Sequence, residues 1–186
     1  VRETPVLPAG ELSRRVGATV VLKAENLQLT GSFKARGATN MIGRLPAEAL
    51  RAGVVAASAG NHAQGVALAA KRRGIPAVIV MPQTTPDIKV QAVRDLGGEV
   101  ELHGDDFDHA YERAVEVARD RGLTFIHPFD DPDVIAGQGT IGMEILRQLS
   151  DPPDAIFVPI GGGVLVAVIA AYVKSLYPKV RIVGVE

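Results

Sequence analysis

Lys34 is the side chain in this sequence best placed to act as a nucleophile. It lies in residues 30–37 (TGSFKARG), where Thr30 or Ser32 is expected to cap the start of a helix. The helix dipole opposes a cation in the first turn and so favours loss of a proton from the amine. The turn therefore predicts an activated amine at Lys34, with an exposed surface lysine as the ordinary alternative.

Ser58, Asn61 and His62 gather in a second turn, residues 58–65 (SAGNHAQG), which follows the apolar stretch VVAA. Backbone N–H groups at the start of the next helix suit a carboxylate or a phosphate, and the Asn61 amide can donate to a phenolate-like oxygen. The turn therefore predicts an anion site. The structural alternative is that Ser58 or Asn61 merely caps the helix.

Three consecutive glycines, Gly161, Gly162 and Gly163, form a third turn between an apolar strand and an apolar helix. Such a turn lets the backbone wrap closely around a ligand, so it predicts a phosphate cradle, with simple packing of helix on strand as the alternative. A dinucleotide-binding half with Glu186 as its acid is a rival interpretation. Val166 stands where the third glycine of that motif belongs, which argues against it.

Short β-branched runs alternate with longer amphipathic or alanine-rich segments along the chain. The runs predict strands at 19–23, 53–57, 77–81, 99–102, 124–126, 155–160 and 180–185, and helices at 33–45, 62–73, 87–96, 106–121, 133–149 and about 164–176. Strands that are apolar throughout indicate burial on both faces. The predicted fold class is α/β, with open parallel sheets flanked by helices, in which strand-to-helix turns bind ligands.

Composition excludes several classes of protein. Without cysteine there is no disulfide framework, zinc finger or thiol nucleophile, and 20 Lys+Arg against 21 Asp+Glu argues against nucleic acid as a partner. The uncharged stretch 155–173 could span a bilayer, but Pro159 and the glycines divide it into a strand and a helix, so no membrane partner is expected. No secretory signal opens the chain, and we expect a cytoplasmic protein.

Three motifs taken in order, residues 32–38, 58–65 and 161–163, resemble the pyridoxal-phosphate-dependent serine/threonine dehydratases of fold type II. The similarity extends across the whole chain and includes residues 127–132 (HPFDDP) and 135–140 (IAGQGT). It implies a two-lobed fold and pyridoxal 5'-phosphate as the cofactor.

The resemblance also implies roles for individual residues. Lys34 would be the Schiff-base lysine, Phe33 would flank the cofactor ring and Asn61 would bind its 3-hydroxyl oxygen. The substrate carboxylate would be received by Ser58, Asn61 and His62. The cofactor phosphate would be held by Gly161, Gly162, Gly163, Val164 and Leu165.

The chemistry implied is removal of the α-proton of threonine or serine by Lys34, β-elimination of hydroxide, and release of a 2-oxo acid and ammonia. Related racemases have a serine as second base at the position of Ala59, so we expect elimination rather than racemisation. A truncated relative that only binds the cofactor and a β-replacement enzyme are the alternatives.

The chain departs from the family pattern in two respects. Val164 and Val168 add bulk to the phosphate loop, and a positive φ at Val164 would strain it and weaken phosphate binding. Family catalytic units are about twice this length, so we expect the chain to be truncated relative to them. We expect a small lobe at 43–150, a partial large lobe at 1–42 plus 151–186 with exposed apolar edges, and a homo-oligomer.

Overall fold

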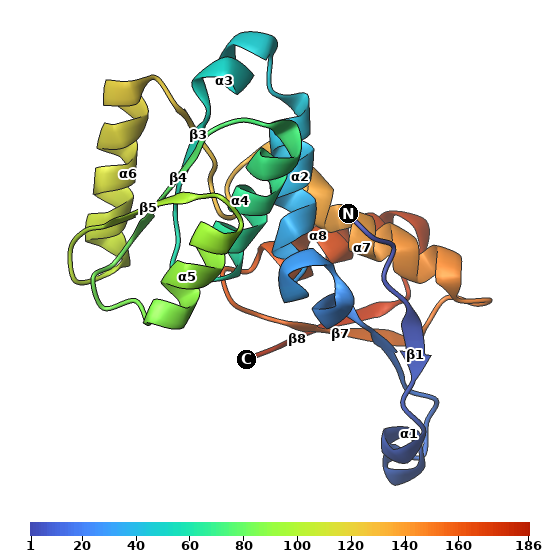
Figure 1. Cartoon of the computed structure of the whole chain (residues 1–186). Helices are drawn as coiled ribbons and strands as arrows, with labels where there is room; N and C mark the ends of the chain where they lie inside the picture. The colour runs from blue at the N-terminus through green and yellow to red at the C-terminus, as the bar shows by residue number, and fades with distance from the viewer. The chain divides into compact units, whose positions relative to one another are not determined.

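The computed structural model describes all 186 residues, and their contacts divide the chain into two units (Figure 1). Unit 2 is the uninterrupted stretch Lys34–Gln138, and unit 1 combines Val1–Phe33 with Gly139–Glu186. The expected lobes differ from these units at two helices. Helix α2 (Lys34–Arg44) belongs to unit 2 because it packs on α4 (Asn61–Arg73), and α7 (Pro132–Gln148) contributes to both units.

Unit 2 is built on a four-stranded parallel sheet in the order β5-β4-β3-β6. Its strands are β3 (Val54–Ala57), β4 (Ala77–Met81), β5 (Glu99–Leu102) and β6 (Thr124–Phe125), and its further helices are α3 (Ala47–Ala52), α5 (Asp87–Asp95) and α6 (Phe107–Arg121). Every residue of β3 and β4 is buried, as the uninterrupted apolar runs predict for a parallel sheet covered on both faces.

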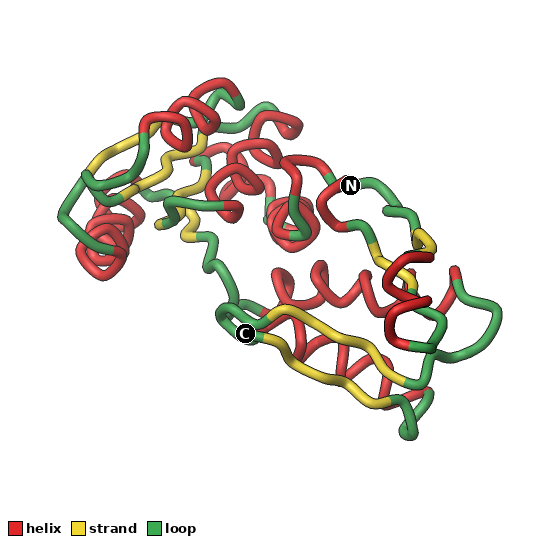
Figure 2. Tube along the Cα trace, turned by 90° about the horizontal axis from the view of Figure 1, so that it is seen from below, coloured by secondary structure: helices red, strands yellow, loops and turns green.

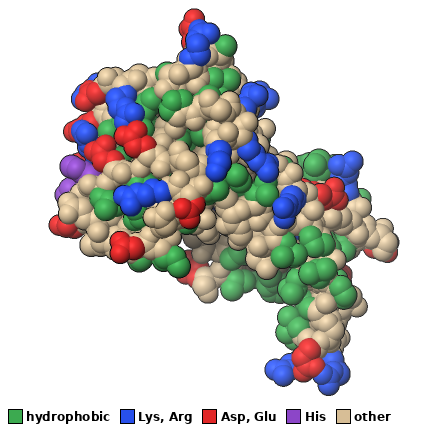
Figure 3. Space-filling view, viewed as in Figure 1, with side chains coloured by type: hydrophobic (Ala, Val, Ile, Leu, Met, Phe, Trp, Pro, Cys, Tyr) green, Lys and Arg blue, Asp and Glu red, His purple; other side chains and the backbone are tan.

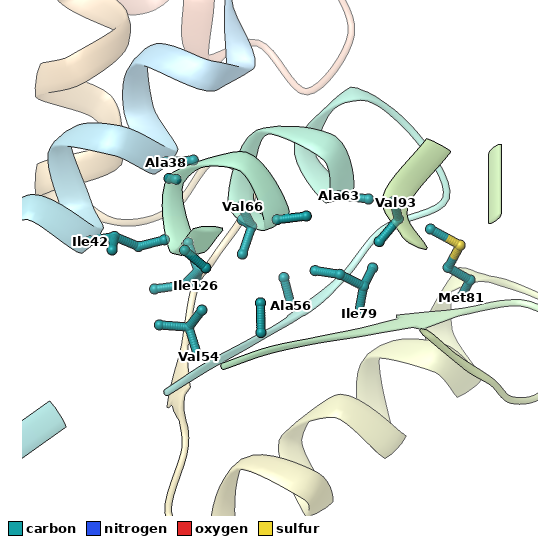
Figure 4. Close-up of a cluster of buried hydrophobic side chains, with 14 of the residues drawn as sticks. Ala38, Ile42, Val54, Ala56, Ala63, Val66, Ile79, Met81, Val93 and Ile126 are labelled. Carbon is teal, nitrogen blue, oxygen red and sulfur yellow. The ribbon is translucent and has the colours of Figure 1, made fainter. Parts of the chain in front are cut away.

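The two faces of this sheet bury separate apolar clusters. Alternate residues such as Val54 and Ile79 pack with α2, α4 and α5 (Figure 4), whereas Val55 and Val78 face α6 on the other side. This arrangement places the carboxyl ends of β3 and β6 beside each other, because the two strands run parallel and pair directly. The turns that follow these two strands therefore begin side by side, at the carboxyl ends of the strands.

Unit 1 contains two small sheets. The antiparallel pair is β1 (Val6–Pro8) with β2 (Val21–Lys23), joined through α1 (Gly10–Val16); the parallel pair is β7 (Ala155–Pro159) with β8 (Arg181–Val185), joined through α8 (Val164–Leu176). Two short 3-10 turns, Glu25–Leu27 and Leu29–Gly31, complete it. Its core joins one face of β7 to α7 and α8 through Ile156, Val158, Ile145 and Ile169. Figure 2 shows helices running along the pair of long strands.

The opposite face of β7–β8 is uncovered. Phe157 is 69% exposed, and Val183 and Val185 are exposed on β8. Leu7, Leu12, Val16 and Leu22 are exposed around the β1–β2 pair, where Figure 3 shows apolar side chains gathered. Parallel sheets are ordinarily buried on both faces, so unit 1 has the exposed apolar surface expected of an incomplete lobe.

Aspartate side chains cap two helices, and the predicted division of the uncharged stretch 155–173 is confirmed. The Asp106 carboxylate accepts a hydrogen bond from His109 N at 3.0 Å at the start of α6, and Asp131 Oδ1 accepts from the Asp133 and Val134 amides at the start of α7. The uncharged stretch forms β7, a turn and α8 rather than one helix. No helix in the structure combines the length and apolar character needed to cross a membrane.

Candidate active site

Lys34 is the first residue of α2 and is half-buried. Its Nζ donates a hydrogen bond to the Pro128 carbonyl oxygen at 2.7 Å. Burial lowers the pKa of the Lys34 amine below its ordinary value, because desolvation disfavours the charged form. The amine is therefore both oriented and more readily deprotonated than a surface lysine, which makes it a competent nucleophile or base.

The predicted capping of this helix by Thr30 or Ser32 is wrong. Both hydroxyl oxygens are buried without a hydrogen-bond partner, and Thr30 adopts the left-handed conformation at φ 63°. The side-chain Oε1 of Gln138, on α7, instead accepts from the Gly37 amide at 3.1 Å. A neighbouring helix thus satisfies an N–H group of the first turn, where side-chain caps are otherwise found.

Close packing fixes the backbone around Lys34. A Cβ atom built on Gly65 of α4 would lie 3.2 Å from the Lys34 carbonyl group, and one on Gly137 of α7 would lie 2.6 Å from the Gly37 Cα. A side chain at Gly137 would displace the backbone of α2, and one at Gly65 would make an unusually tight contact with it. Helices α4 and α7 therefore hold the Lys34 backbone in a defined position.

The turn after β3 leaves the start of α4 open. Ser58 Oγ accepts from the Gly60 amide at 3.2 Å, and no side chain caps the helix at Gly60. Capping by Ser58 or Asn61, the structural alternative, is thus not seen. Asn61 is exposed, and the first-turn N–H groups of α4 are oriented as an anion-binding helix terminus requires.

His62 lies in the same helical turn but is buried, with an exposed fraction of 3%. Its Nε2 lies 2.9 Å from the Ile126 carbonyl oxygen, and its Nδ1 has no hydrogen-bond partner. Burial lowers the pKa of His62 to about 4. The ring is therefore neutral at pH 7, and its one proton must be on Nε2 to donate to Ile126.

This buried imidazole should make stability depend on pH. Above pH 6.5, the ordinary histidine pKa, the ring is neutral in the folded and unfolded chains. Between that pH and the folded pKa of about 4, only the unfolded chain binds the proton, so stability falls as the pH falls. We expect His62 to account for about 3 kcal/mol of the lost free energy of unfolding. Urea titrations at pH values above and below this range measure the free energy of unfolding of the parent chain and of His62→Gln. The same loss of free energy in both chains would contradict this expectation.

The glycine turn lies in unit 1, between β7 and α8. Gly163 takes the positive φ of 79° and precedes the helix, and no side chain caps the start of α8. Cβ atoms built on Gly161 or Gly163 would meet nothing within 4 Å, so their backbone is open to a ligand. Val164 is the first helical residue and Leu165 is buried in the core. The expected strain at Val164 is therefore absent, because Gly163 adopts the left-handed conformation instead.

Each unit has features that fit one part of a phosphate-bearing aldehyde. In unit 2, the desolvated amine of Lys34 fits an aldehyde group and the uncapped helix start at Asn61 fits an anion. In unit 1, the open glycine turn at the start of α8 fits a phosphate. Phe33, predicted to flank the cofactor ring, packs half-buried against the core of unit 1.

Comparison with known proteins identifies the family. A family model described as "Pyridoxal-phosphate dependent enzyme" matches residues 1–186. The chain belongs to this family of pyridoxal-phosphate-dependent enzymes. The biosynthetic, chloroplastic threonine dehydratase of Arabidopsis thaliana is 59% identical over 184 residues, which are 99% of this chain and 31% of that protein.

Two solved structures also match the chain. Threonine deaminase isoform 2 from Solanum lycopersicum, in its processed form, has a TM-score of 0.94 and 52% identity over 98% of this chain and 50% of that one. Maize serine racemase has a TM-score of 0.95 and 39% identity over 100% of this chain and 56% of that one. The predicted α/β fold of type II is confirmed, and the chain spans only about a third to a little over half of these relatives.

Sequence reasoning missed the residues that accept hydrogen bonds from Lys34, Gly37 and His62. Ile126, Pro128 and Gln138 lie in the stretches 127–132 and 135–140 or next to them, which marked the family resemblance without suggesting a role. Two of these three residues act through main-chain carbonyl oxygens, which every residue carries, so their side-chain identities gave no indication of the contact.

Proposed function

We propose that the protein is a threonine (serine) dehydratase, which converts threonine to 2-oxobutanoate and ammonia, and serine to pyruvate and ammonia. The observation that carries this proposal is the oriented, desolvated amine of Lys34 at the head of α2. Pyridoxal phosphate, when bound, supplies the electron sink for the carbanion formed at the substrate α-carbon.

In this proposal Lys34 has two duties. Its neutral amine would hold the cofactor aldehyde covalently, with loss of water, and as a free amine it would accept the α-proton of the substrate. Both duties require an unprotonated amine near neutral pH, which the lowered pKa favours. The Pro128 carbonyl gives that amine a fixed direction.

The turn after β3 is assigned to the substrate and to the cofactor ring. The Ser58 hydroxyl and the backbone N–H groups of Asn61 and His62 would bind the substrate carboxylate at the open start of α4, and the Asn61 side chain would bind the 3-hydroxyl oxygen. Residues Gly161–Leu165 would hold the phosphate through the uncapped amides of α8, with Phe33 beside the ring.

A substrate panel tests the activity. Incubated with pyridoxal phosphate and threonine, a dehydratase releases 2-oxobutanoate, measured with a coupled 2-oxo acid assay. A β-replacement enzyme would consume threonine or serine only when a second nucleophile is added. A chain that binds the cofactor but releases no 2-oxo acid would be the truncated, inactive relative and would contradict the proposal for this chain.

Racemisation is the second candidate, because maize serine racemase shares this fold closely. The residue after Ser58 is Ala59, which has no hydroxyl to return a proton to the opposite face of the substrate. We expect pyruvate from L-serine and no fast formation of D-serine, measured by chiral chromatography. D-serine at a rate comparable with pyruvate would exclude the elimination-only assignment.

We also propose an oligomeric state and a cellular location for the protein. Relatives act as longer chains, and unit 1 exposes an apolar face, so we expect the active protein to include further polypeptide or further copies of this chain. A homo-oligomer in the cytoplasm remains our prediction.

A further inference from the structure

His62 and Lys34 both contact main-chain carbonyl oxygens of one short segment; the His62 contact is buried and the Lys34 contact is part-buried. His62 Nε2 lies 2.9 Å from the carbonyl oxygen of Ile126, and Lys34 Nζ donates to the carbonyl oxygen of Pro128 at 2.7 Å. The two accepting carbonyls are two residues apart on the segment Ile126–Pro128, which leaves the carboxyl end of β6. Any shift of this segment at Ile126 would be transmitted to the group that orients the lysine amine.

Further contacts on either side of the Ile126 carbonyl restrict how this segment can move. The Ile126 amide donates to the Val55 carbonyl of β3 at 2.8 Å, and the side chain of Ile126 is fully buried. Beyond it, His127 Nδ1 accepts from the Asp130 amide at 2.7 Å. Pro128 has a fixed φ and no amide hydrogen, which further limits the local conformations.

We propose that His62 is a positioning residue for Lys34, which donates from Nε2 to the Ile126 carbonyl and so fixes the segment whose Pro128 carbonyl holds the lysine amine. This inference rests on the proposed function, in which that amine is the reacting group. In this proposal the backbone and the side chain of His62 have different roles. The backbone N–H belongs to the proposed carboxylate site, and the imidazole positions Lys34 through the segment Ile126–Pro128.

The state of the ring agrees with this role. A neutral imidazole has one proton, and placing it on Nε2 leaves Nδ1 as a bare acceptor, buried and without a partner. Such a ring has no N–H left to donate to a substrate carboxylate. Burial, with smaller effects from the nearby Lys34 and His127, keeps the pKa of His62 low and preserves the neutral form.

Trace acetylation of the cofactor-free 186-residue chain tests the proposal. The rate at Lys34 is followed by peptide mass spectrometry between pH 7 and 11, with the exposed Lys89 as internal reference. In His62→Phe, which lacks the donor, we expect the midpoint for Lys34 to rise by about one pH unit. The released amine moves on its flexible stem into water, where the charged form is favoured. In His62→Gln, whose amide can donate near the Nε2 position, the midpoint should remain that of the parent chain.

The controls separate positioning from general loss of stability. Ile126→Val removes buried volume from the same segment but keeps its carbonyl, so it should lower the melting temperature and leave the Lys34 midpoint unchanged. If His62→Phe does not fold by circular dichroism, His62→Asn replaces it, since the shorter amide cannot reach Ile126.

An unchanged midpoint in the donor-free variant, or a shift in His62→Gln equal to it, overturns the proposal. Because no cofactor or substrate is present, either result leaves the dehydratase assignment to its own test, and failure of the substrate panel leaves this one standing.

Discussion

We expect replacement of Lys34 by alanine to abolish the visible absorbance that cofactor binding should give the chain and to lower 2-oxo acid formation by at least about a hundredfold. The reason is that Lys34 is the amine assigned both to the bond with the aldehyde and to proton removal. Its contact with Pro128 and its lowered pKa suit it to both tasks.

Lys89→Ala is the matched control for this result. Lys89 lies on α5 of the same unit and is exposed, so its loss should leave the spectrum and the rate unchanged. The measurement is a titration of each chain with pyridoxal phosphate, followed by addition of threonine. Retention of the absorbance band in Lys34→Ala would show that another amine binds the cofactor and would remove Lys34 from the proposed site.

Gly137→Ala should destabilise the protein by about 2 kcal/mol or more, although alanine is the better helix former by about 1 kcal/mol. The added Cβ would lie 2.6 Å from Gly37 Cα and 2.7 Å from the Arg36 carbonyl oxygen. Both are backbone atoms of α2, which cannot yield as the end of a flexible side chain can. The helix that begins at Lys34 would have to move.

Gly142→Ala, on the same helix α7, provides the comparison. Its Cβ would meet only Tyr172 Cδ1 at 3.4 Å and atoms farther away, which is ordinary van der Waals contact. We expect this variant to be neutral or up to about 1 kcal/mol more stable than the parent chain. Urea denaturation measures the free energy of unfolding of both variants. Equal values would show that the close approach of α7 to α2 does not require glycine at position 137.

The fold was largely predictable because periodicity and burial agree in this sequence. The run AVIVM at Ala77–Met81 and the apolar helix Val164–Leu176 have the bounds that their patterns indicate. The missed elements are α1, α3, β1 and the two short 3-10 turns. None of them buries a side chain completely, so they lack a sharp apolar pattern. Amphipathic periodicity arises because one face of an element is buried. A segment that lies on the surface therefore shows no such periodicity.

The side chains of the candidate site could be predicted from the sequence, but the main-chain groups that contact them could not. Lys34, Asn61 and the glycine turn have residue types that chemistry restricts, whereas the carbonyls of Ile126 and Pro128 could belong to any residue. The capping of α2 failed for a related reason. A local hydroxyl at Ser32 was available, but the amide of Gly37 is satisfied by Gln138, 101 residues away.

The division into units has a consequence for the order in which the protein folds during synthesis. Unit 2 is one continuous stretch, so its sheet and both its apolar clusters are complete once residue 138 has emerged from the ribosome. Unit 1 must wait, because Lys23 on β2 pairs with Glu144 at 2.6 Å and Thr4 with Gln148, across more than a hundred intervening residues. Helix α2 therefore gains its packing partner α4 before the glycine turn has been translated. Vectorial synthesis thus favours folding of the surroundings of Lys34 first.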